Sequence, residues 1–92
     1  MAICYILYAQ SLGKFYIGHT TEPIDVRLKK HLSNHKGFTA KAKDWIIVFQ
    51  EFFETKEDAY HRELQIKSWK SSQKIRELIE KHSSTGSEHP DL

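Results

Sequence analysis

Two apolar segments near the N-terminus, with a glycine between them, constrain the fold of this chain more than any other feature. Residues 3–9 and 15–20 are rich in β-branched and aromatic side chains, which predicts two β-strands. Gly13 favours a turn that joins them as an antiparallel hairpin. A connection of two or four residues, or a β-bulge, would place Tyr5 and Tyr16 on one face, whereas a plain three-residue connection would separate them.

The remaining sequence predicts a third strand and three helices. Residues 45–53 are apolar at almost every position, which favours a central strand covered on both faces. Helix-starting residues and apolar spacing predict helices over residues 23–33, over 55–69 and from Ser71 or Ser72 onward, with a basic loop over 34–43. The expected fold class is α/β of the α+β type: a three-stranded antiparallel sheet flanked by helices.

The size and composition of the chain limit its organisation. Ninety-two residues can bury only one modest core, so we expect one domain over residues 1–82 and a flexible polar tail over residues 83–92. The single cysteine, Cys4, excludes an internal disulfide and fits a reducing compartment. No apolar run approaches the roughly 20 residues of a membrane span, so we expect a cytoplasmic protein that is not bound to membranes.

Positive charge is concentrated in one part of the chain. The net charge is only +2, but residues 26–43 contain no Asp or Glu and six basic residues, namely Arg27, Lys29, Lys30, Lys36, Lys41 and Lys43. Such a block fits either a solvated surface or a surface that binds a phosphate backbone.

Three polar residues lie within or beside the apolar faces of two predicted helices. Arg27 and His31 lie four residues apart on the first predicted helix, about 60° from its apolar stripe and so at the edge of the core. Glu63 points from the middle of the apolar arc of the second predicted helix. A carboxylate there indicates either a buried ion pair or a metal ligand at a cleft.

These residue types fit the cleavage of a phosphodiester. That reaction needs a positioned water, a base, a cation against the developing charge and often a divalent metal. The planar guanidinium of Arg27 matches phosphate oxygens. A phenol with a pKa of about 10 needs a cation, a metal or an imidazole to act as a base, and His31 and His19 are candidates for that help.

Four segments together resemble a GIY-YIG endonuclease domain. They are Ile3-Cys4-Tyr5, then Tyr16-Ile17-Gly18, then residues 25–31 and then residues 59–69. The resemblance covers about residues 3–79 and is to the compact, stand-alone bacterial branch related to the nuclease domain of the DNA-repair subunit UvrC. Ile3 stands in place of the glycine of the first motif, and members of this branch often lack that glycine.

The resemblance implies a role for each candidate residue. Tyr5 and Tyr16 would be the active-site phenols, with His31 assisting the first of them. Glu63 would be the single carboxylate that binds one Mg²⁺ or Mn²⁺. Arg27 would stabilise the scissile phosphate, and His19 falls where some relatives have a lysine near that phosphate.

We therefore expect a metal-dependent DNA endonuclease, selective for a DNA structure or for single strands. We expect five lysines to bind the phosphate backbone of the DNA: Lys29, Lys30, Lys36, Lys41 and Lys43. A nucleic-acid-binding module of the same fold without cleavage is the alternative, and an interaction domain with no nucleic-acid role is a third reading. We expect a monomer or weak homodimer, with targeting by a partner protein, since the chain has no appended recognition module.

Overall fold

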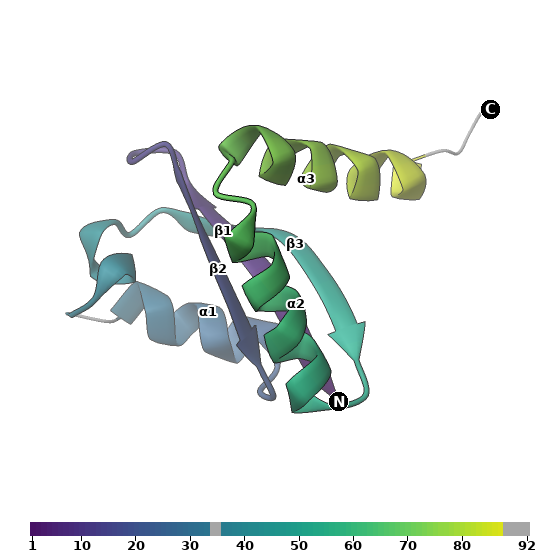
Figure 1. Cartoon of the computed structure of the whole chain (residues 1–92). Coiled ribbons are helices and arrows are strands. Elements are labelled where there is room, and N and C mark those ends of the chain that lie inside the picture. The colour runs from purple at the N-terminus through teal and green to yellow at the C-terminus, as the bar shows by residue number, and fades with distance from the viewer. Residues whose placement is uncertain (34–35, 88–92) are drawn as a thin grey trace.

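The computed structural model describes residues 1–33 and 36–87, which form three strands and three α-helices around one sheet (Figure 1). The strands are β1 (Ala2–Ala9), β2 (Lys14–Thr20) and β3 (Trp45–Phe53). The helices are α1 (Ile24–Ser33), α2 (Lys56–Ser68), α3 (Ser72–Ser87) and the short 3₁₀ helix η1 (Phe38–Lys41). The sheet is antiparallel throughout, so the predicted fold class is confirmed.

The central strand is β1, because the strand order is β2-β1-β3. The prediction that residues 45–53 form the central strand is therefore wrong. β1 is buried at almost every position, whereas β3 lies at an edge and leaves Ile46 and Phe52 more than half exposed, at 56% and 57%. A continuous apolar run favours a strand covered on both faces, but it does not fix the place of the strand in the sheet, and β3 keeps part of its apolar surface exposed.

The hairpin between β1 and β2 places both tyrosines on one face. Ala9 pairs with Lys14, which leaves a four-residue connection, and Gly13 within it has a positive φ of 63°. Tyr16 pairs with Leu7, two positions along β1 from Tyr5. Because side chains alternate across a strand, the four-residue connection gives the two phenols the shared face that the sequence analysis required.

Different helices cover the two faces of the sheet. On one face, Tyr5 and Leu7 pack with Leu28 and Leu32 of α1. The other face holds Cys4, Ile6 and Ile17, against which α2 and α3 pack through Ala59, Ile66 and Ile75. Figure 1 shows α1 and α2 on opposite sides of the strands. Each face thus has its own apolar cluster, and the sheet separates them.

The helix starts follow the predicted capping residues. The Thr55 hydroxyl accepts a hydrogen bond from the Asp58 amide, and the Ser71 hydroxyl accepts one from the Lys74 amide. α3 continues past His82 to Ser87, so the first part of the predicted tail is helical, and residues 88–92 lie outside the described residues. Among the described helices, none combines the length and apolar character needed to cross a membrane.

Candidate active site

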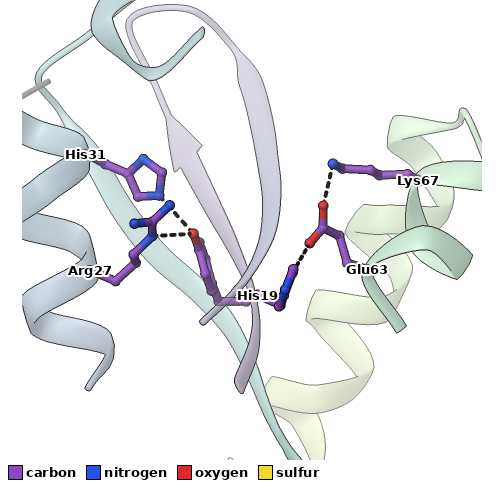
Figure 2. Close-up of polar contacts among 6 residues, drawn as sticks. His19, Arg27, His31, Glu63 and Lys67 are labelled. Carbon is purple, nitrogen blue, oxygen red and sulfur yellow. Dashed lines mark hydrogen bonds and ion pairs between the residues drawn. The ribbon is translucent and has the colours of Figure 1, made fainter. Parts of the chain in front are cut away.

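Tyr5 is the centre of a small polar group on the α1 face of the sheet. Its hydroxyl lies 2.8 Å from Nε2 of His31 and accepts a hydrogen bond of 3.4 Å from Nε of Arg27. Arg27 and His31 are one turn apart on α1, so both side chains reach the same point of β1 (Figure 2). The predicted i, i+4 pair therefore meets the first predicted phenol.

His31 lies deeper than the sequence indicated. We expected it at the edge of the core, but it is only 5% exposed, whereas the apolar stripe of α1 is half-buried. The cover comes from η1, whose Thr39 places its hydroxyl 3.1 Å from Nδ1 of His31. Sequence reasoning did not identify Thr39, because one threonine in a basic loop carries no signal of its partner.

Tyr16 lies beside this group on the adjacent strand. Its ring meets the imidazole of His31 edge-on at 4.9 Å and stacks on Phe38 at 6.2 Å, with an interplanar angle of 19°. These residues line a cleft of about 340 Å³; its lining residues are Tyr16, Arg27, Lys30, His31, Gly37, Phe38 and Thr39. The cleft has cationic and aromatic walls, and none of its described lining residues is acidic, which suits an anionic ligand with planar groups.

Gly18 gives the phenol of Tyr5 its position. The two residues are cross-strand partners, and a Cβ added at Gly18 would lie 2.6 Å from the Tyr5 hydroxyl oxygen and 3.3 Å from a ring carbon of Tyr16. Both distances are shorter than ordinary van der Waals contacts. The absence of a side chain at Gly18 therefore lets the Tyr5 ring lie over β2.

Burial keeps the phenol and the imidazole in their neutral forms. Desolvation raises the pKa of the Tyr5 phenol, and the hydrogen bond and positive charge of Arg27 oppose part of that rise. Desolvation also lowers the pKa of His31, and the charge of Arg27 lowers it further. A neutral imidazole beside a neutral phenol can accept the phenolic proton, while Arg27 stabilises the resulting phenolate.

Glu63 belongs to a second polar group, on the α2 face. It is 8% exposed; one carboxylate oxygen lies 2.6 Å from Nδ1 of His19, and the other accepts a hydrogen bond of 2.5 Å from Nζ of Lys67. Figure 2 shows the separation, with Arg27 and His31 extending from α1 and Glu63 and Lys67 from α2. The buried ion pair considered for Glu63 is therefore present.

The structure thus brings four of the five predicted catalytic side chains together and holds the fifth, Glu63, in a neighbouring group. Among the described residues, no hydrogen bond joins Glu63 to Tyr5, although the negative charge of Glu63 is a minor cause of the raised pKa of the Tyr5 phenol. His19 contacts Glu63, so its position is tied to the carboxylate.

The donor set fits a divalent cation that is only partly held by protein. Over residues 1–33 and 36–87, no group of three or more His, Cys, Asp or Glu side chains could hold a metal ion. Mg²⁺ commonly binds one or two carboxylates and takes its remaining ligands from water and substrate phosphates. Glu63 suits that mode of binding. A metal ion there would displace the ammonium group of Lys67 from the Glu63 carboxylate.

The five predicted DNA-binding lysines lie on or near α1 and η1. Lys30 lines the cleft and pairs with Glu22 at 2.7 Å, and Lys41 lies over the ring of Phe38 at 5.2 Å. Lys43 donates to the Leu32 carbonyl. Lys29 and Lys36 are exposed. The basic block is therefore on the same side of the sheet as Tyr5 and His31.

The chain is similar in sequence to known proteins. The family model described as the GIY-YIG catalytic domain matches residues 1–76. A curated relative, the "UPF0213 protein SH2523" of Staphylococcus haemolyticus (strain JCSC1435), is 32% identical over 71 residues, which cover 75% of this chain and 84% of that protein. No solved structure matches.

Proposed function

Because this chain belongs to the GIY-YIG catalytic domain family, a family of nucleases, we propose that it is a metal-dependent DNA endonuclease. Its substrate is a phosphodiester of DNA, and its products carry a 5′-phosphate and a 3′-hydroxyl. We propose that Tyr5, Tyr16, Arg27, His31 and Glu63 form its site.

The observation that carries the proposal is the triple contact at the Tyr5 hydroxyl. A buried phenol is a poor base, but this one has an imidazole to accept its proton and a guanidinium to stabilise its anion. A tyrosine that served only to pack the core would need neither of these two partners. The three groups together fit the activation of a water molecule.

Each side chain has a separate task in the proposed reaction. Tyr5 takes a proton from the attacking water after passing its own proton to His31. Arg27 stabilises the phenolate and lies in the cleft wall, where it can also contact a phosphate oxygen. The phenol of Tyr16 can donate a hydrogen bond to the same phosphate. Glu63 would hold Mg²⁺ or Mn²⁺, which supplies charge stabilisation at the phosphate when bound.

Cleavage of defined DNA by the purified protein tests the proposal. Single-stranded, duplex and branched DNA would be incubated with Mg²⁺, with Mn²⁺ and with EDTA, and products would be resolved on denaturing gels. We expect cleavage only with metal, and losses of at least about 100-fold in Tyr5→Phe and Glu63→Gln. Tyr60→Phe, which changes an exposed tyrosine on α2, is the matched control. Hydrolysis that persists in both site variants would rule out the assigned roles.

One observation favours a second candidate function. Lys67 and His19 already occupy both oxygens of the Glu63 carboxylate. If the cation of Lys67 holds that carboxylate permanently, the protein would be a nucleic-acid-binding module without turnover. Salt-sensitive DNA binding with no cleavage in either metal would favour this candidate.

A further inference from the structure

His31 is held at both of its ring nitrogens. Nε2 lies 2.8 Å from the Tyr5 hydroxyl, and Nδ1 lies 3.1 Å from the hydroxyl of Thr39. Thr39 is only 3% exposed, and its hydroxyl makes no other hydrogen bond among the described residues. A neutral imidazole carries one proton, so one ring nitrogen donates and the other accepts.

Two proton arrangements satisfy these distances. In the first, the Tyr5 hydroxyl donates to Nε2, and Nδ1–H donates to Thr39. In the second, the Thr39 hydroxyl donates to Nδ1, and Nε2–H donates to the phenol. Only the first leaves Nε2 with a free electron pair for the phenolic proton, so the tautomer decides whether His31 can serve as a base.

Arg27 favours the first arrangement. Its guanidinium donates to the Tyr5 hydroxyl and, having no acceptor, must use a lone pair of the phenol oxygen. A phenol that accepts from a cation is a stronger donor and a weaker acceptor for a second N–H. Each arrangement leaves one buried hydroxyl proton without an acceptor among the described residues, that of Thr39 in the first and that of Tyr5 in the second, so the contact with Arg27 decides between them.

We propose that Thr39 is a positioning residue that accepts from Nδ1–H of His31 and thereby keeps Nε2 as the acceptor for the Tyr5 proton. The inference deepens the proposed nuclease function and rests on it for its catalytic consequence. The assignment of the tautomer itself does not depend on cleavage.

The proton balance of the step is complete. The O–H bond of Tyr5 breaks, its proton joins Nε2, and His31 becomes an imidazolium that keeps its Nδ1–H on Thr39. The Tyr5 phenolate then takes a proton from the attacking water, whose oxygen forms the new bond to phosphorus as the bond between phosphorus and the 3′-oxygen breaks. The departing 3′-oxygen takes a proton from solvent and becomes the 3′-hydroxyl. After cleavage, the proton on Nε2 is lost to solvent.

The local packing makes the hydroxyl of Thr39 separable from the fold. The backbone carbonyl of Thr39, not its side chain, accepts the hydrogen bond of 2.9 Å from the indole of Trp45. A Thr39→Val substitution therefore keeps that anchor and nearly the same side-chain shape. Among the residues that the structure describes, the titratable and charged groups near His31 are Tyr5 on β1, Tyr16 on β2, and Arg27 and Lys30 on α1.

Nitrogen NMR of the imidazole tests the tautomer without any substrate. Two-bond ¹H–¹⁵N correlation spectra at pH 7.5 distinguish a protonated from an unprotonated ring nitrogen, and a His31→Gln spectrum assigns the signals. We expect protonated Nδ1 and unprotonated Nε2 in the wild type and in Thr39→Ser. In Thr39→Val, where Nδ1–H would be buried without an acceptor, we expect a shift to the Nε2–H tautomer. A wild-type ring protonated at Nε2, or a Val variant with no shift, would overturn the proposal.

The cleavage rate tests the catalytic consequence. We expect kcat of Thr39→Val to fall about 10- to 100-fold with KM for DNA unchanged, and Thr39→Ser to recover most of it. Thr20→Val is the matched control, since Thr20 is also buried but bonds the Glu22 amide. An unchanged kcat in Thr39→Val would refute the positioning role while the nuclease function stands. A wild-type protein that cuts no DNA would refute the nuclease function, with the tautomer still decided by NMR.

Discussion

Gly18 shows how one missing side chain shapes the candidate site. The Tyr5 hydroxyl occupies the space that a Cβ at Gly18 would need. We predict that Gly18→Ala displaces the phenol from His31, costs about 1–3 kcal/mol of folding free energy by overpacking, and abolishes cleavage. Urea unfolding and the cleavage assay would measure the two effects.

The hairpin glycine provides the control for this prediction. Gly13 has a positive φ of 63°, but a Cβ there would meet nothing within 4 Å. Gly13→Ala should therefore lose about 1–2 kcal/mol through backbone strain and keep its cleavage rate. Equal activity losses in the two alanine variants would contradict the specific role of Gly18.

His31 should make stability depend on pH. Burial and the charge of Arg27 lower the pKa of this imidazole in the folded protein. As the pH falls below about 6.5, the ordinary pKa of histidine, the unfolded chain binds a proton that the folded chain binds only at lower pH. The stability present above that pH should therefore be lost as the pH falls through the folded pKa.

Urea unfolding between pH 5 and pH 8 measures this effect. His31→Gln removes the titrating ring and should flatten the curve below about pH 6.5. His61→Gln, which changes an exposed histidine on α2, is the matched control. A His31→Gln curve parallel to that of the wild type would contradict the assignment.

At the scale of elements, α2 carries both the candidate metal ligand and its competitor. Glu63 and Lys67 are one turn apart, so their ion pair forms within the helix. We predict that Lys67→Met frees the carboxylate and tightens Mn²⁺ binding about 2- to 5-fold, the value of a partly exposed ion pair of up to about 1 kcal/mol. Isothermal titration would measure the affinity.

A lysine of α3 provides the matched control for Lys67→Met. Lys74→Met also removes one lysine charge. Lys74 is exposed, and none of the ion pairs among the described residues includes it. Its Mn²⁺ affinity should equal that of the wild type, and Glu63→Gln should abolish binding. Weaker binding in Lys67→Met than in Lys74→Met would argue against competition at Glu63.

At the scale of the whole molecule, the placement of charge predicts the salt dependence of DNA binding. Lys30 and Lys41 lie at or beside the cleft, and each phosphate contact contributes roughly 0.9 to the slope of log K against log salt for duplex DNA. The Lys30→Gln/Lys41→Gln double variant should therefore reduce the slope by up to about 2. Fluorescence anisotropy across a range of salt concentrations would measure it.

The control for this experiment removes the same total charge elsewhere. Lys56 is the first residue of α2, and Lys74 lies in α3. Both helices pack on the opposite face of the sheet. A Lys56→Gln/Lys74→Gln variant should keep the wild-type slope. Equal slopes in the two double variants would show that DNA does not bind along the basic block.

The fold was largely predictable because its signals are local. Strand composition, the turn glycine and the capping residues Thr55 and Ser71 each act within a few residues, and all were placed correctly. The order of the strands was not predictable from residues 45–53, because coverage of an apolar strand depends on which other elements pack against it.

For the candidate site too, one part was predictable from the sequence and another depended on the tertiary structure. The sequence by itself identified the candidate site residues, and the i, i+4 spacing of Arg27 and His31 on one helix set their common direction. Only the tertiary structure decided the burial of His31, the approach of Thr39 and the pairing of Glu63 with His19. These contacts join segments distant in the chain, and their geometry depends on how helices pack on a sheet rather than on any local pattern.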